Sequence, residues 1–225
     1  MAYILNIETS TTNCSVSLSN QGETLFLKED NDLNYSHAER LHPFIAEILE
    51  EAELKPGDLN AIAVSKGPGS YTGLRIGVSA AKGLCFALDK PLIAIPSLEI
   101  LAHQITADEG VIIPLLDARR MEVFSAIYKS SFKLKRKTKA EIIEESSFES
   151  YLNVGPVYFI GNGVSKTKET IHHPNAIFTE DKLPSAREMS AIAFKKFRNK
   201  KFEDVAYFEP YYLKDFIAIK PKPKF

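Results

Sequence analysis

The chain has 225 residues, of which 44% are hydrophobic and 25% are charged, and its formal net charge is −1 at pH 7. This composition is typical of a folded globular protein and excludes a largely disordered one. No apolar run approaches the ~20 residues of a membrane-spanning helix, and a near-neutral chain is a poor nucleic-acid binder by net charge alone.

The cysteines and the N-terminus indicate a compartment. Cys14 and Cys85 lie far apart, without CxxC spacing or neighbouring histidines, which favours buried and reduced thiols. The first residues lack the basic start of a signal peptide. We therefore expect a cytoplasmic protein with no membrane segment.

The chain begins with strands around a hydroxyl-rich hairpin. Residues 3–8, 14–19 and 24–27 have the apolar patterns of strands, and Glu8 precedes the hairpin 9–13. An actin-like or sugar-kinase-like ATPase domain begins in this way, with the hairpin near the nucleotide phosphates. An ordinary polar hairpin is the alternative.

A helix is predicted next, opened by a capping box of Ser36 and Glu39. Its apolar residues keep helical spacing: Leu41, Phe44, Ile45, Ile48, Leu49 and Ala52. His37 and His42 are five residues apart, which does not place them on one helix face as a metal-binding pair requires. We interpret them as polar surface histidines.

The glycine-rich segment 66–84 organises the first half. The turn at 67–69 follows a buried strand at 61–64, and a helix capped by Ser70 or Thr72 follows the turn. In that helix Gly73, Gly77 and Ala81 recur at steps of four. Glycine within a helix costs about 1 kcal/mol relative to alanine, so this small face predicts the close approach of another helix or strand.

The same segment departs from two common phosphate-binding motifs. A Walker loop ends in Gly-Lys-Ser/Thr, but Gly73 is followed by Leu74 and Arg75. A dinucleotide fingerprint has Gly-x-Gly-x-x-Gly, and the spacing of Gly67, Gly69 and Gly73 is one residue too long. The packing interpretation is therefore favoured.

A second series of predicted strands begins after residue 110. A strand at 91–95 and a helix from 96 to 103 complete the first half, and strands at 111–116, 123–128 and 131–139 follow. This restart predicts a duplicated α/β architecture with two halves facing each other across a cleft. The expected subdomains are residues 1–106 and residues 107–225, the second with a mobile basic tail.

Charge is divided unevenly between these halves. Residues 1–106 carry seven Lys and Arg against 13 Asp and Glu, and residues 107–225 carry 21 against 16. The lysine-rich tract 133–139 favours protection of an exposed sheet edge over contact with RNA. Gly161-Asn162-Gly163 predicts a strand-to-helix turn that approaches an adenosine or simply turns, and residues 184–188 open the last helix.

Four segments together resemble the TsaB (YeaZ) family, the dimerisation subunit of the bacterial machinery that makes threonylcarbamoyl-adenosine in tRNA. The matching segments are residues 7–10, 36–41, 66–77 and 117–120. The resemblance covers residues 1 to about 130 well and the remainder weakly.

The resemblance implies an actin-like ATPase (ASKHA, ribonuclease H-like) duplicated fold, with a mixed sheet flanked by helices in each subdomain. It also implies a non-catalytic scaffold that binds TsaD, a paralogue that modifies the adenosine next to the anticodon of ANN-decoding tRNAs. The ATPase TsaE is expected to join this pair, and the chain alone is expected to form a homodimer. We expect tRNA to be contacted only indirectly, and ATP or ADP to be bound only within the complex.

TsaD-like proteins hold a metal with a His-x-x-x-His pair at the start of the helix after residues 91–95. This chain has Ser97 and Leu101 at those positions, and His103 lies off that register. Leucine cannot coordinate a metal. The resemblance therefore implies no metal site and no catalytic residues.

The residues expected to function fall into two groups. Those for partner docking are His37, Arg40, Leu41, Phe44, Tyr71, Gly73, Arg75, Ile76, Gly77, Ala80 and Ala81; those near a nucleotide are Thr9, Ser10, Thr11, Gly161 and Gly163. One alternative is an ATP-dependent small-molecule kinase, with Glu8 and Asp117 as the carboxylates for magnesium. A metallopeptidase is the weaker alternative, because the chain lacks a His-Glu-x-x-His helix.

Overall fold

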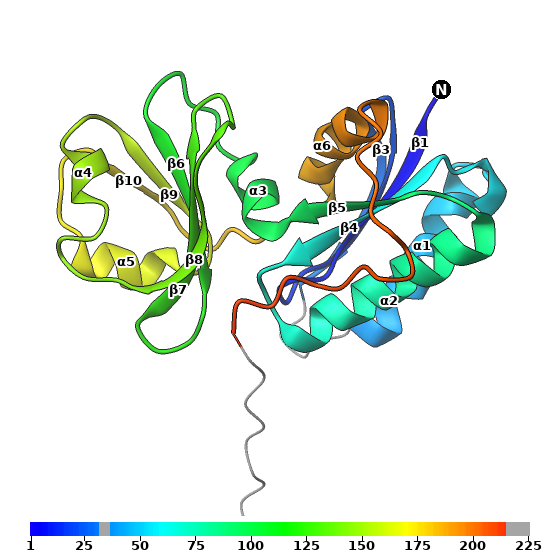
Figure 1. Cartoon of the computed structure of the whole chain (residues 1–225), viewed down its shortest axis with the longest axis horizontal. Coiled ribbons are helices and arrows are strands. Elements are labelled where there is room, and N and C mark those ends of the chain that lie inside the picture. Colours follow the sequence, from blue (N-terminus) through cyan, green and yellow to red (C-terminus); the bar gives the residue numbers. More distant parts are fainter. Residues whose placement is uncertain (32–36, 215–225) are drawn as a thin grey trace, which may run out of the picture.

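A computed structural model describes residues 1–31 and 37–214. It has two halves, each built on a five-stranded sheet, and they stand side by side in Figure 1. The predicted cap at Ser36 and the basic tail at 220–225 lie outside the described residues. Within the described ranges, no helix combines the length and apolarity that a membrane crossing needs.

The first sheet has the strand order β3-β2-β1-β4-β5. Its strands are β1 (Tyr3–Glu8), β2 (Cys14–Asn20), β3 (Glu23–Asp30), β4 (Ala61–Gly67) and β5 (Leu92–Pro96). β1, β2 and β3 form an antiparallel meander, whereas β4 and β5 run parallel to β1. The hairpin 9–13 therefore lies at the same edge as the carboxyl ends of β4 and β5.

The second sheet repeats this topology. Its strands are β6 (Val111–Asp117), β7 (Glu122–Lys129), β8 (Leu134–Ile142), β9 (Val157–Ile160) and β10 (Ala176–Thr179), in the order β10-β9-β6-β7-β8. β6, β7 and β8 form the meander, and β9 and β10 run parallel to β6. The duplicated ribonuclease H-like, actin-like fold expected from the sequence is confirmed.

Helices cover both faces of the first sheet. α1 (His37–Glu51) and α2 (Tyr71–Leu88) pack on one face through a core that includes Leu41, Ile48 and Val78. α6 (Ala186–Arg198) packs on the other face, where Met189 and Ile192 meet Ile93. Short helices complete the fold: η1 (Pro56–Asp58), α3 (Ser97–Ala102), α4 (Glu149–Leu152) and α5 (Val164–Thr170).

The position of α6 differs from the expected subdomain division. The first sheet ends with β5 and the second begins with β6, but the chain crosses back after β10 and α6 joins the core of the first half (Figure 1). Residues 199–214 then run along the first half: Val205 and Phe208 pack against its core, and the Tyr211 amide donates to the Lys66 carbonyl over 2.7 Å. The C-terminal region therefore contributes to both subdomains.

Candidate functional site

The hairpin after β1 is enclosed by the chain itself. Thr9, Ser10 and Thr11 are all buried. The Thr9 hydroxyl donates to the Gly73 carbonyl over 2.8 Å, and the Ser10 carbonyl accepts from the Ser70 amide over 2.7 Å. The hairpin is thus fastened to the start of α2, and its nucleotide contacts remain a prediction.

Glu8 ends β1 with a fully buried carboxyl group. Its Oε1 atom accepts a hydrogen bond from the Ser10 amide over 2.5 Å. Because burial disfavours the charged form more than hydrogen bonds to Ser10 and Ser65 favour it, the pKa of Glu8 is raised to about 7. Near neutral pH the group is therefore divided between its protonated and ionised forms.

The glycine face of α2 is sealed inside the monomer. A Cβ atom at Gly73 would overlap the Thr9 carbonyl oxygen, and one at Gly77 would overlap the Thr9 hydroxyl. The close approach predicted from the helical glycines is therefore made by the chain's own hairpin. The expectation of partner docking is wrong for five residues that are buried in the monomer: Gly73, Gly77 and Ala81 on α2, and His37 and Leu41 on α1.

The opposite face of α2 is the open one. Its exposed residues are Thr72, Arg75, Ser79, Gly83, Phe86 and Ala87. Ile76, Ala80 and Leu84 are half-buried beside them. A Cβ at Gly83 would meet nothing within 4 Å, and Phe86 is 85% exposed. We call Ser79, Gly83, Phe86 and Ala87, with Ile76 and Ala80, the α2 outer face.

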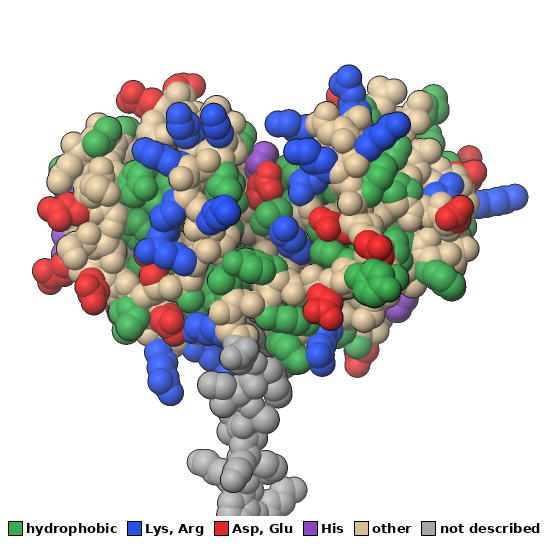
Figure 2. Space-filling view, in the orientation of Figure 1, with side chains coloured by type: hydrophobic (Ala, Val, Ile, Leu, Met, Phe, Trp, Pro, Cys, Tyr) green, Lys and Arg blue, Asp and Glu red, His purple; other side chains and the backbone are tan. Residues whose placement is uncertain are grey.

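The other expected docking residues are at least partly accessible on α1 and α2. Arg75 is exposed and stacks its guanidinium over Tyr71 at 4.3 Å from the ring centroid, and Tyr71 in turn meets Tyr212 at 4.9 Å. Arg40 is exposed on α1 and pairs with Asp30, while Phe44 is half-buried. Figure 2 shows hydrophobic side chains at the surface over α2 and over residues 199–214, which run along α2 in Figure 1.

Sequence reasoning missed Ser79, Gly83, Phe86 and Ala87. They also recur at helical spacing, so periodicity could have found them. It could not tell which of the two small faces of α2 turns inward, because both combine small residues with apolar neighbours.

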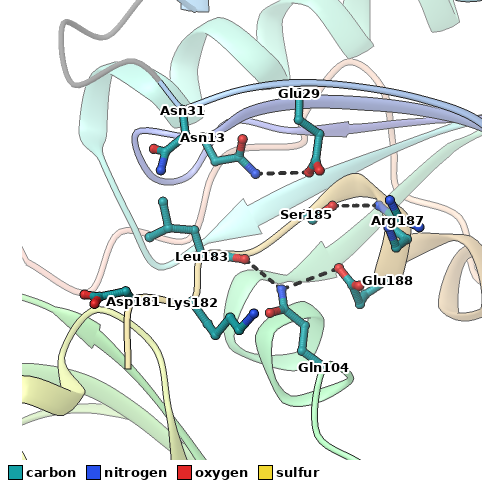
Figure 3. Close-up of a pocket in the computed structure, with 10 residues that line it drawn as sticks. All are labelled: Asn13, Glu29, Asn31, Gln104, Asp181, Lys182, Leu183, Ser185, Arg187 and Glu188. Atoms are coloured by element: carbon teal, nitrogen blue, oxygen red, sulfur yellow. Dashed lines mark hydrogen bonds between the residues drawn. The ribbon is translucent and has the colours of Figure 1, made fainter. Parts of the chain in front are cut away.

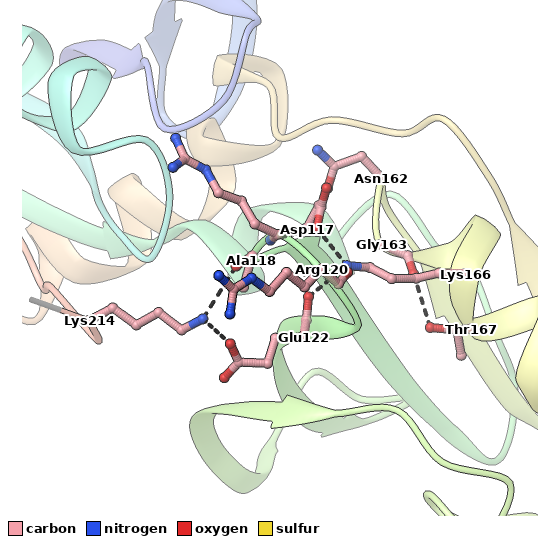
Figure 4. Close-up of polar contacts among 10 residues, drawn as sticks. Asp117, Ala118, Arg120, Glu122, Asn162, Gly163, Lys166, Thr167 and Lys214 are labelled. Carbon is pink, nitrogen blue, oxygen red and sulfur yellow. Dashed lines mark hydrogen bonds and ion pairs between the residues drawn. The ribbon is translucent and has the colours of Figure 1, made fainter. Parts of the chain in front are cut away.

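The turn after β6 is held by a lysine (Figure 4). Lys166 donates to the Asp117 carboxylate over 2.6 Å and to the carbonyl oxygens of Arg120 and Glu122. Lys214 bonds to the Glu122 carboxylate, which ties the C-terminal segment to the second half. Asp117 is thus already engaged, although the kinase alternative assigned it to magnesium.

Gly161 and Gly163 are buried against β6. A Cβ at Gly161 would overlap the Leu115 carbonyl, and the Gly163 amide donates to that carbonyl over 3.1 Å. Gly161 also has a φ of 124°, which other residues rarely adopt. The turn therefore accounts for both glycines, and their role near an adenosine remains a prediction.

The positions that correspond to metal ligands in TsaD-like proteins lie between the two sheets. Leu101 belongs to an apolar cluster with Leu116 and Phe124 of the second half, and Ser97 is fully buried. His103 stacks on Phe132 at 4.0 Å, and burial lowers its pKa. Among residues 1–31 and 37–214, no group of three or more His, Cys, Asp or Glu could hold a metal ion.

A polar pocket of about 480 Å³ lies at the junction of the halves (Figure 3). It is lined by Asn13, Glu29, Asn31, Gln104, Asp181, Lys182, Leu183, Ser185, Arg187 and Glu188. Gln104 donates to the Leu183 carbonyl over 2.7 Å, and Asn13 donates to Glu29 over 3.2 Å. Asn13 also donates to the Pro184 carbonyl over 3.1 Å, which joins the hairpin region to the linker before α6. Bonds between parts of the chain that are far apart in the sequence therefore line this pocket.

Comparison with known proteins identifies a family. The family model described as "TsaD: tRNA N6-adenosine threonylcarbamoyltransferase" matches residues 32–221. A Bacillus subtilis protein named "tRNA threonylcarbamoyladenosine biosynthesis protein TsaB" is 40% identical over 126 residues, covering 56% of this chain and 55% of that protein. The Escherichia coli protein of the same name is 29% identical and covers 98% of both chains.

A solved structure has the same architecture. The structure titled "YeaZ from Pseudomonas aeruginosa" superposes with a TM-score of 0.82 at 27% identity, over 95% of this chain and all of that chain. A second structure from that organism, described as similar to peptidase YEAZ, gives a TM-score of 0.84. The likeness therefore extends through both halves.

Proposed function

Because this chain belongs to the TsaB (YeaZ) family of tRNA threonylcarbamoyladenosine biosynthesis proteins, we propose that it is a non-catalytic subunit that binds and stabilises TsaD. The observation that carries the proposal is the α2 outer face. Small residues there let another helix approach closely, and the exposed Phe86 supplies an apolar anchor. Apolar groups left open on a helix that is otherwise well packed are typical of a protein interface.

TsaD is the partner that best fits this face. The TsaD family model matches residues 32–221, which include α1 and α2, so we expect TsaD to have helices that correspond to these two. A second copy of this chain could use the same face, which accords with the expected homodimer. We further propose that TsaE joins the pair and that the complex works in the cytoplasm. Sedimentation of the chain alone and with TsaD would distinguish a homodimer from a heterodimer.

The docking face is tested by substitutions at its centre and end. Ser79→Arg and Phe86→Asp should each weaken binding to TsaD at least tenfold, because a charged group would be buried without a partner. The measurement is the dissociation constant from titration of labelled TsaD. Val154→Asp is the matched control, since Val154 is 86% exposed but lies in the second half. Wild-type affinity in both α2 variants would contradict the proposal.

The isolated chain is expected to bind ATP weakly. Glu8 is a poor magnesium ligand because burial raises its pKa to about 7, and Asp117 is engaged by Lys166. Calorimetric titration with ATP and magnesium should therefore give no micromolar binding, whereas the complex with TsaD should bind. Micromolar affinity of the chain alone would favour the kinase alternative.

A further inference from the structure

Basic residues are concentrated in two segments outside the α2 outer face. Residues 129–140 contain six Lys and Arg and no Asp or Glu, and residues 182–201 contain seven Lys and Arg and one Glu. The remainder of the chain carries 15 Lys and Arg against 28 Asp and Glu. The near-neutral net charge therefore conceals two strongly positive segments.

These segments reach the same face of the molecule. The first includes most of β8, the edge strand of the second sheet, and the second includes α6 on the first sheet. Figure 2 shows Lys and Arg side chains gathered over β8 and over α6, on either side of the hollow between the two halves. A ligand that contacts both groups would span both subdomains.

Several of these cations are available to a ligand. Lys133, Lys135 and Lys137 are exposed, and within the described residues no carboxylate oxygen lies within 4.0 Å of their ammonium groups. Lys139 differs, since it pairs with Glu141 at 2.9 Å. The lysines on β8 are thus only partly neutralised.

On α6, exposed Lys195 and Arg198 line a groove of about 510 Å³ beside the turn between β2 and β3. Phe194 lies in the same groove, with the Arg198 guanidinium 6.0 Å from its ring centroid. Protection of a sheet edge could account for lysines on β8, but it does not account for cations on a helix.

We propose that this basic face, comprising Lys133, Lys135, Lys137, Lys195 and Arg198, binds the phosphate backbone of RNA. Exposed cations distributed over an extended surface suit a polyanion, which gains affinity by releasing counterions. RNA is the polyanion chosen because the inference rests on the proposed function in tRNA modification. Direct binding of RNA by the basic face replaces the expectation that tRNA contacts this chain only indirectly.

The test measures binding of an unmodified tRNA transcript to the full chain by fluorescence anisotropy, from 50 to 200 mM salt. Lys135→Glu/Lys137→Glu should lower the affinity about tenfold at 100 mM salt and reduce the slope of log affinity against log salt by about two. Lys195→Glu/Arg198→Glu should act similarly. Lys55→Glu/Lys90→Glu makes the same change in net charge away from both segments and should have little effect.

Two results would overturn the inference. One is that the folded wild-type chain does not bind tRNA at 50 mM salt, and the other is that the control variant loses as much tRNA affinity as the β8 and α6 variants. If the β8 and α6 variants bind tRNA normally but lose TsaD, the face serves a protein partner. Ser79→Arg should lose TsaD and keep tRNA, so failure of the docking proposal is distinguishable from failure of this one.

Discussion

Gly73→Ala should lower the free energy of unfolding by about 3 kcal/mol, although alanine is the better helix former by about 1 kcal/mol. The new methyl group would overlap the Thr9 carbonyl oxygen, so either the hairpin or α2 must move. Gly77→Ala meets the Thr9 hydroxyl and should have a similar effect. Thermal unfolding followed by circular dichroism should show a melting temperature about 10 °C lower for each variant.

Gly83 provides the matched control on the same helix. A Cβ there meets no atom within 4 Å, so Gly83→Ala should raise the free energy of unfolding by about 0.5–1 kcal/mol. If Gly73→Ala were instead as stable as the wild type, the hairpin would not rest on α2. A large residue at Gly77 would therefore abolish partner binding by unfolding the chain, which makes that position unsuitable for testing the interface.

Glu8→Gln should stabilise the protein at pH 8 by about 3 kcal/mol and leave it nearly unchanged at pH 4.5. Burial raises the pKa of Glu8 from 4.5 in the unfolded chain to about 7 in the folded one. Each unit of this difference is worth about 1.4 kcal/mol. Glutamine keeps the oxygen that accepts the Ser10 amide and carries no charge at any pH.

The sign follows from proton binding. Between pH 4.5 and about 7 the folded chain holds a proton on Glu8 that the unfolded chain has released. The stability contributed by the protonated group is complete below pH 4.5 and is lost as pH rises through about 7.

Urea unfolding of wild type and variant at pH 5, 6, 7 and 8 measures this difference directly. Other groups titrate equally in both proteins, so subtraction isolates Glu8. Glu50→Gln, at an exposed position on α1, is the control and should give a small, pH-independent difference. A constant difference for Glu8→Gln across this range would show that the pKa of Glu8 is not raised.

The amino-acid sequence determined the order of the elements and the duplication. Apolar runs of strand length and the restart after residue 110 predict the two sheets, since period and length depend on local geometry. Gly73 and Gly77 likewise predict a close approach to α2. Glycine is unfavourable within a helix unless a packing neighbour leaves no room for a side chain, and this holds for any kind of neighbour.

Only the tertiary structure decided what makes that approach. A helical glycine serves a hairpin of its own chain or a helix of another protein equally well, and spacing along one helix contains no information about the neighbour. The same limit applies to α6, whose periodicity gives an inward face but not the sheet that receives it, and to Leu101, which packs between the halves. Each of these contacts joins residues far apart in the sequence, so it depends on how the complete chain closes its two cores.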